Sequence, residues 1–120
     1  MRKIRSAAAV AVLLVVVACG GGVSQPAGST KVTMSEYKFD PSNISVKSGK
    51  VTFFLVNQGS LQHDMVVQDK SGATVGKSDL LGAGDQSVFT IDNLPAGQYT
   101  FFCDVPGHRQ SGMQGTLSAT

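Results

Sequence analysis

The stretch Gly97-Gln-Tyr-Thr-Phe-Phe-Cys103-Asp-Val-Pro-Gly-His108-Arg-Gln-Ser-Gly-Met113-Gln-Gly115 joins a β-strand pattern to a loop that carries sulfur and imidazole side chains. Side chains of a strand repeat every second residue, so Tyr99, Phe101 and Cys103 share one face. We expect this face to be the inner one, because it carries aromatic side chains. The Cys103 thiol is then shielded from water at the end of a core strand.

The loop after this strand places three potential metal ligands close together. Four residues separate Cys103 from His108, and four more separate His108 from Met113. Pro106 favours a turn by fixing φ, and Gly107 does so by allowing a positive φ. We therefore expect the loop to curl its thiol, imidazole and thioether around one point.

His63, the other of the two histidines, lies 40 residues before Cys103 and must join the loop from elsewhere in the fold. Two His, one Cys and a weakly bound Met form the donor set of a blue-copper electron-transfer site. We predict one type-1 copper ion with the ligands His63, Cys103, His108 and Met113. For Met113, simple core packing is the alternative, and zinc could also occupy a site of one Cys and two His.

Short β-rich runs separated by turn residues fill the chain after the first 30 residues. Regularly spaced strands with Gly, Pro, Asn, Asp and Ser between them predict an all-β Greek-key sandwich or barrel of about seven or eight strands. Residues 70–86 have the weakest pattern and are expected to form a loop or a short helix. The predicted strands are 32–39, 44–46, 51–57, 64–68, 87–91, 99–103 and 115–118.

Residues 92–99, Asp-Asn-Leu-Pro-Ala-Gly-Gln-Tyr, place a tyrosine soon after a corner and shortly before Cys103. This arrangement resembles the tyrosine corner of Greek-key sandwiches. We expect an architectural role for Tyr99. A role as an electron relay is the alternative.

The N-terminus has the pattern of a bacterial export signal. Three basic residues among the first five precede an apolar run over 7–18, which is shorter than the roughly 20 residues of a membrane-spanning helix but suits a secretory signal. The small and aliphatic residues directly before Cys19 resemble a lipobox. We predict a signal peptide in 1–18, a lipidated Cys19 with a flexible linker in 19–30, and one domain in 31–120.

Removing residues 1–18 takes three charges from the formal +2 and leaves 7 basic against 8 acidic residues. This balance argues against nucleic-acid binding, which needs a basic face. We expect an exported monomer that Cys19 anchors to the outer face of a bacterial cell membrane or to a periplasmic face. An exported chain with two cysteines can form a disulfide. We predict none, because Cys19 lies at the cleavage site and Cys103 in the ligand loop.

Residues 63–66, His-Asp-Met-Val, and the stretch 97–115 resemble the cupredoxins, the small blue copper proteins that include plastocyanin, azurin, auracyanin and rusticyanin. The spacing of the Cys, His and Met is closest to auracyanin and rusticyanin. The resemblance covers residues 31–120. It implies one copper ion that cycles between Cu(I) and Cu(II), and it makes His108 the candidate electron port.

Two carboxylates and one glutamine depart from the family pattern. Asp64 stands where the family commonly has an Asn whose amide ties the ligand loops together, and Asp104 directly follows Cys103. Two carboxylates near a thiolate favour Cu(II) and lower the potential, unless one of them holds a proton. Gln62 stands where azurin has a Gly whose carbonyl approaches copper, so we expect four ligands rather than five.

The resemblance implies a carrier of single electrons between redox proteins or membrane electron-transfer complexes, and the residues before Cys19 predict that this carrier is lipid-anchored. We expect no enzyme activity, because four side-chain ligands leave no open position on the metal. The alternative is a surface protein that binds copper and passes it on, although the chain lacks a Met- and His-rich cluster. A small oxidase or reductase has less support, since no further His is available for a second copper. Val105, Pro106 and Arg109 suggest a docking face for an acidic or haem-bearing partner.

Overall fold

The computed structural model of the chain describes residues 22–120. The predicted signal peptide and Cys19 lie outside the described residues. Within residues 22–120, no helix is long and apolar enough to cross a membrane. This part of the chain forms nine strands: β1 (Thr30–Ser35), β2 (Lys38–Asp40), β3 (Asn43–Val46), β4 (Gly49–Asn57), β5 (Val66–Gln68), β6 (Thr74–Lys77), β7 (Gln86–Leu94), β8 (Gly97–Phe102) and β9 (Gln114–Ala119).

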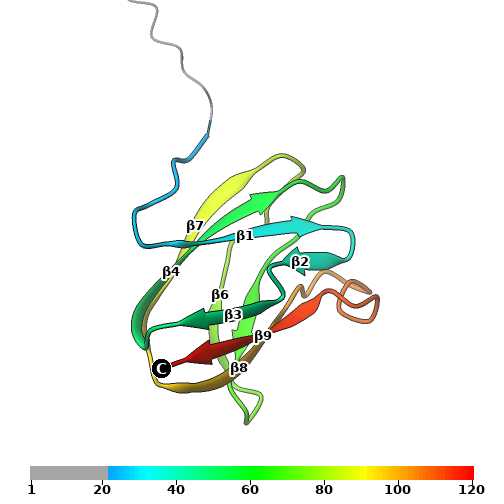
Figure 1. Cartoon of the computed structure of the whole chain (residues 1–120). Coiled ribbons are helices and arrows are strands. Elements are labelled where there is room, and N and C mark those ends of the chain that lie inside the picture. The colour runs from blue at the N-terminus through cyan, green and yellow to red at the C-terminus, as the bar shows by residue number, and fades with distance from the viewer. Residues whose placement is uncertain (1–21) are drawn as a thin grey trace, which may run out of the picture.

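The strands form two sheets that pack face to face (Figure 1). One sheet has the order β2-β1-β4-β7 and the other has the order β3-β9-β8-β5-β6. Neighbouring strands are antiparallel except for the pairs β1 with β4 and β3 with β9, which are parallel. This arrangement confirms the predicted all-β sandwich.

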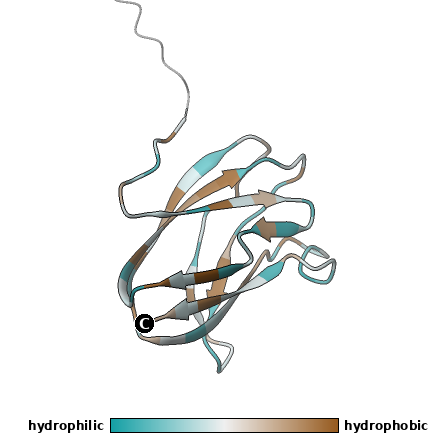
Figure 2. Ribbon diagram, viewed as in Figure 1, coloured by the Kyte–Doolittle hydropathy of each residue, from teal (hydrophilic) through white to brown (hydrophobic). Residues whose placement is uncertain are grey.

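The core lies between the two sheets, where apolar side chains alternate inward. In Figure 2 the hydrophobic colour is concentrated on the strands, and the connecting turns are mostly hydrophilic. Phe53 of β4 is paired with Phe89 of β7, and their rings stack at 5.7 Å between centroids. Phe39 and Phe101 make an edge contact at 5.0 Å, which joins β2 of one sheet to β8 of the other.

The predicted inner face of β8 is confirmed, because Tyr99, Phe101 and Cys103 are all buried. Phe102 points to the other face but is also buried, since the guanidinium of Arg109 lies 3.9 Å from its ring centroid. The cation therefore covers an aromatic ring that the strand alternation alone would leave in water.

The tyrosine corner is present. The hydroxyl of Tyr99 donates a hydrogen bond of 2.6 Å to the backbone carbonyl of Pro95. This bond holds the β7–β8 connection against the strand that leads to Cys103, which is the architectural role expected from the sequence.

Two expectations about individual strands were wrong. Residues 32–39 form two strands, β1 and β2, with a turn at Glu36 and Tyr37. The stretch 70–86, expected to be a loop or a short helix, contains β6, which pairs with β5 at the edge of the second sheet. These two differences raise the number of strands in the described chain to nine.

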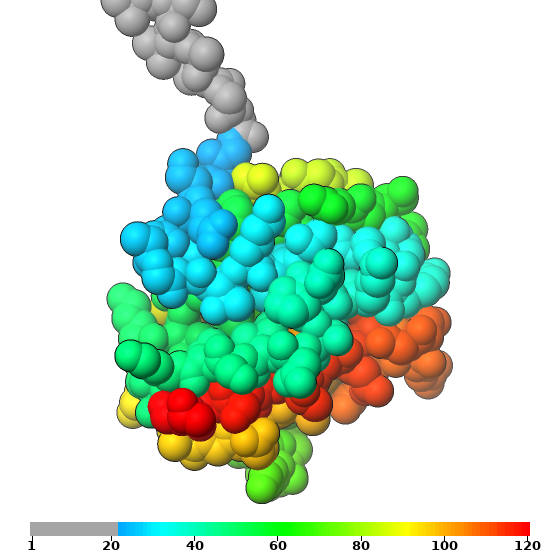
Figure 3. Space-filling model, viewed as in Figure 1, coloured from blue at the N-terminus to red at the C-terminus, as the bar shows by residue number. Residues whose placement is uncertain are grey.

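The loop after β8 and the turn between β1 and β2 lie at the same end of the sandwich, opposite the C-terminus (Figure 1). In the space-filling view the orange surface of this loop protrudes beside the cyan surface of the β1–β2 region (Figure 3). The sandwich thus brings segments from residues 36, 63 and 103–113 together at one end.

Candidate metal centre

Three predicted ligands converge at this end of the sandwich. The Nδ1 atoms of His63 and His108 are 3.1 Å apart, and the Sγ of Cys103 lies 3.9 Å from the first and 3.6 Å from the second. All three side chains are buried. Each residue thus offers one donor atom to a common point that is shielded from solvent.

His63 is held in place by an isolated β-bridge to the segment that precedes β7. Its N–H donates to the carbonyl of Leu81 at 3.0 Å, and the N–H of Leu81 donates to the carbonyl of His63 at 2.9 Å. This bridge fixes the backbone of His63 before β5 begins. The imidazole is fully buried as a result.

The ligand loop is closed by its own backbone hydrogen bonds. The N–H of Cys103 donates to the carbonyl of Met113 at 3.2 Å, and the N–H of Met113 donates to the carbonyl of His108 at 3.1 Å. Gly107 has a φ of 83°, which confirms the turn expected there. The loop therefore holds three of the predicted ligands in a fixed backbone arrangement.

Met113 is fully buried and belongs to the same cluster of apolar side chains as Cys103. The thioether is therefore enclosed in the protein directly after the ligand loop. Met65 is also fully buried in that cluster. Cys103 itself is a free thiol.

The donor set fits copper. Burial raises the pKa of the Cys103 thiol and lowers the pKa of His63, so both groups favour their neutral forms in the metal-free protein. A bound cation reverses this preference for the thiol, because a coordinating sulfur loses its proton. Thiolate and imidazole donors in a buried cluster are suited to a soft or borderline metal rather than to Mg²⁺ or Ca²⁺.

Two residues beside the histidines were missed by the sequence analysis, namely Glu36 and Tyr37. The carboxylate Oε1 of Glu36 lies 3.3 Å from Nε2 of His63. The ring of Tyr37 makes an edge contact with that of His108, with 5.0 Å between centroids. Both residues lie in the β1–β2 turn. This turn was missed by the sequence analysis because one continuous strand was predicted over 32–39.

A buried carboxylate joins the segments that carry His63 and Cys103. Oδ1 of Asp64 accepts the backbone N–H of Asp104 at 2.8 Å, and Asp104 forms an ion pair of 2.6 Å with Lys77. Burial raises the pKa of Asp64 to about 6. The pKa of Asp104 is lowered by its hydrogen bond with Asp64 and by the nearby Lys77. Lys77 thus offsets part of the negative charge beside the thiol.

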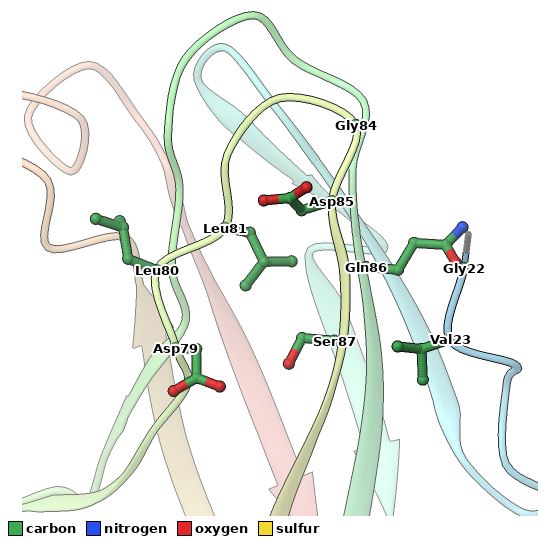
Figure 4. Close-up of a pocket in the computed structure, with 9 residues that line it drawn as sticks. All are labelled: Gly22, Val23, Asp79, Leu80, Leu81, Gly84, Asp85, Gln86 and Ser87. Atoms are coloured by element: carbon green, nitrogen blue, oxygen red, sulfur yellow. The ribbon is translucent and has the colours of Figure 1, made fainter.

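A separate hollow of about 420 Å³ lies outside this donor cluster (Figure 4). It is lined by the segment before β1, the loop between β6 and β7, and the first residues of β7. None of the four predicted copper ligands lines it. The metal chemistry of the described chain is therefore concentrated in the cluster of His63, Cys103 and His108.

Comparisons with known proteins agree with this fold. The structure is similar to dithionite-reduced auracyanin from Roseiflexus castenholzii, with a TM-score of 0.69, 19% identity, and coverage of 77% of this chain and 96% of that one. It is similar to the oxidised form of plastocyanin from Dryopteris crassirhizoma, with a TM-score of 0.59, 26% identity, and coverage of 76% and 100%.

A relative in sequence is the copper-resistant cuproprotein CopI from Rubrivivax gelatinosus, which is 25% identical in an alignment of 114 residues that covers 81% of this chain and 69% of the relative. The family model described as a cupredoxin-like domain matches residues 6–119. The chain therefore belongs to the cupredoxin-like family.

Proposed function

We propose that this protein carries single electrons by means of one copper ion bound to His63, Cys103, His108 and Met113. The observation that carries the proposal is the convergence of two imidazole nitrogens and one thiol sulfur, which lie within 4.8 Å of one another and belong to three buried residues. Copper in such a site supplies one-electron chemistry by alternating between Cu(II) and Cu(I).

Each ligand has a distinct role in this proposal. Cys103 provides the strong thiolate bond, and His63 and His108 complete the set of strong donors. Met113 acts as the weak axial ligand that tunes the reduction potential. Four side-chain ligands leave no open position for a substrate, so the proposed function is transfer of electrons and not catalysis.

The relatives support an electron carrier. Auracyanin and plastocyanin were described in a dithionite-reduced and an oxidised form respectively. Proteins of this fold therefore occur in both oxidation states. The sandwich suits electron transfer, since a fixed geometry of the donor atoms limits rearrangement of the copper site when the oxidation state changes.

Electrons would pass through the end of the sandwich where His108 lies. His108 is 7% exposed, and the exposed residues Tyr37, Pro106 and Gly107 surround it in space or sequence. Arg109 adds one positive charge to this surface. We expect a redox protein or a membrane electron-transfer complex to dock here, with the chain acting as a monomer.

The proposed location is the outer face of a bacterial cell membrane or a periplasmic face. The sequence pattern before Cys19 supports removal of residues 1–18 and lipidation of Cys19. Metabolic labelling with a radioactive fatty acid tests this step. Label should appear in the wild-type chain and disappear in Cys19→Ser, and label retained in that variant would contradict the proposed anchor.

Copper handling is the second candidate, because the relative CopI is described as a copper-resistant cuproprotein. A copper-handling protein passes the ion itself to a partner, whereas a carrier keeps the ion and passes an electron. The buried cluster favours the carrier, since deep burial of all three donors slows release of the ion.

The decisive experiment is the visible absorption spectrum of the purified chain after addition of one equivalent of Cu(II). An intense thiolate-to-copper band should appear, bleach with ascorbate, return on reoxidation and be absent in Cys103→Ala. A copper chelator added between redox cycles separates the candidates. Retention of the band supports the carrier, and rapid loss of copper supports the copper-handling function. A colourless complex would contradict both the site and the carrier.

A further inference from the structure

Glu36 contacts the outer nitrogen of a predicted copper ligand. Nδ1 of His63 faces the Sγ of Cys103 and the Nδ1 of His108, while Nε2 of the same ring lies 3.3 Å from Oε1 of Glu36. A carboxylate can only accept a hydrogen bond from Nε2–H. The ring is then left with its lone pair on Nδ1, which is the nitrogen that points at the donor cluster.

The loop before His63 is shaped to hold this carboxylate. The N–H groups of Ser60 and Leu61 donate to Oε1 of Glu36 at 2.8 and 2.6 Å. A Cβ at Gly59 would stand 2.6 Å from Oε1 and 2.7 Å from Oε2, so the absence of a side chain there makes room for Glu36. The carboxylate thus lies in a cradle of backbone donors, and those donors hold the pKa of Glu36 below its ordinary value.

Asn57 fixes the cradle from within the core. This fully buried side chain shares its two amide N–H groups among the carbonyls of Leu61, Leu81 and Gly82 at 2.8 to 3.0 Å, and its Oδ1 accepts the N–H of Gly59 at 2.9 Å. Leu81 is the residue whose backbone pairs with His63. One amide therefore links the cradle of Glu36 to the bridge that positions His63.

We propose that Glu36 is a positioning residue for the copper site, which orients the ring of His63 through Nε2–H and whose negative charge favours Cu(II) over Cu(I). The inference rests on the proposed function, because it assigns a role toward the same copper ion. Carboxylates that accept the outer N–H of a metal-bound histidine set its tautomer and raise its basicity. A more basic ligand with a nearby negative charge stabilises the more highly charged metal ion.

The competing role for Glu36 is purely structural, because the same carboxylate also ties the β1–β2 turn to residues 60 and 61. Two variants separate the roles. Glu36→Gln retains an oxygen acceptor of similar size but removes the charge, and Glu36→Ala removes both. Asp92→Asn is the matched control, since it removes one exposed carboxylate from β7.

The first readout is the tautomer of His63 in the metal-free protein, measured by ¹⁵N NMR of the imidazole. We expect a single form with the proton on Nε2 in the wild type, in Glu36→Gln and in Asp92→Asn. Glu36→Ala should show a mixture of tautomers. A single Nε2–H tautomer that persists in Glu36→Ala would overturn the positioning role.

The second readout is the reduction potential of the copper-loaded protein. In Glu36→Gln the ratio of Cu(II) to Cu(I) affinity should fall about tenfold, which raises the one-electron potential by about 59 mV. Asp92→Asn should leave it unchanged. An unchanged potential in Glu36→Gln would overturn the role of the charge. Absence of the thiolate-to-copper band in the wild type would instead contradict the proposed function, and the NMR of the metal-free protein would still decide whether Glu36 positions His63.

Discussion

Asp64 accepts a hydrogen bond from the backbone N–H of Asp104, with 2.8 Å between Oδ1 and N. The bond ties the segment of His63 to that of Cys103, which is the role that an Asn amide commonly plays in the cupredoxins. Asp64 is only 2% exposed. This chain therefore makes the same connection with a group that can also carry a negative charge beside the thiol.

Asp64→Asn should raise the reduction potential of the copper-loaded protein. The substituted side chain still offers an oxygen to the N–H of Asp104 but removes a negative charge that stabilises Cu(II). At pH 8 we expect an increase of roughly 30 to 60 mV, which corresponds to about a three- to tenfold change in relative affinity. Voltammetry measures the shift, with Asp92→Asn as the control for a distant carboxylate. An unchanged or lower potential would count against this role.

The stability of the metal-free protein should fall as the pH rises from about 4 to about 6. Burial raises the pKa of Asp64 from 3.8 in a model peptide to about 6, so the folded state binds this proton more tightly than the unfolded state does. The lowered pKa of His63 acts in the opposite direction, since it adds stability as the pH rises toward 6.5, whereas the lowered pKa of Asp104 acts mainly below pH 4. The net loss between pH 4 and pH 6 should be up to about 2 kcal/mol, because this window covers only part of the roughly 3 kcal/mol that the shift of Asp64 represents and His63 offsets some of it.

Urea denaturation at a series of pH values measures this loss. Asp64→Asn should abolish most of the decrease between pH 4 and 6, because the amide does not titrate. If the stability of Asp64→Asn fell as much as that of the wild type over this range, the pH dependence would arise from other groups.

The sequence was sufficient to predict the fold because its strongest patterns are local. Alternation in β8, the turn at Gly107 and the corner before Tyr99 each depend on residues close together in the chain. The spacing of Cys103, His108 and Met113 likewise identified a loop, and the structure places His63, which was expected to come from a separate segment, beside Cys103 and His108.

The surroundings of the histidines could not be predicted because they depend on a turn that the pattern hid. Val32 and Met34 are buried at even positions, whereas Phe39 is buried at an odd position. An uninterrupted strand would put Phe39 on the opposite face. The shift of the apolar residues from even to odd positions therefore indicates a turn at Glu36 and Tyr37 that the sequence analysis did not use. Their contacts with His63 and His108 also require the pairing of distant strands, which no local pattern contains.

Tyr99→Phe should weaken the fold without changing the copper site. The substitution removes the hydrogen bond to the carbonyl of Pro95, and the net cost should be about 1 kcal/mol. Thermal or urea denaturation measures the loss of stability. The electron self-exchange rate of the copper-loaded protein should stay at the wild-type value. A large fall in that rate would instead support the alternative in which Tyr99 relays electrons.

Met113→Leu should leave the copper bound but raise the reduction potential. The leucine side chain has a similar volume and fills the buried space of Met113, but it provides no sulfur donor for Cu(II). The thiolate-to-copper band should persist in the absorption spectrum, and voltammetry should show the higher potential. Met65→Leu is the matched control, because Met65 is equally buried and is not a predicted ligand. Equal potentials in the two variants would mean that Met113 only packs.

Asn57→Ala should be among the most damaging polar substitutions in the protein. Asn57 is fully buried, and its loss leaves the N–H of Gly59 and the carbonyl of Leu61 without this partner, whereas the carbonyls of Leu81 and Gly82 keep the N–H groups of His63 and Asp85. A buried group that loses its hydrogen bond costs about 1 to 3 kcal/mol, so the two lost partners should reduce the stability by about 2 kcal/mol or more.

Urea denaturation of the metal-free protein tests this value. Asn93→Ala is the control, because Asn93 is exposed on β7 and its replacement should change the stability by less than about 0.5 kcal/mol. The tautomer of His63 should also become mixed in Asn57→Ala, since the cradle that holds Glu36 depends on this amide. A stable variant with an unchanged His63 tautomer would show that the loop over residues 57–61 keeps its shape without Asn57.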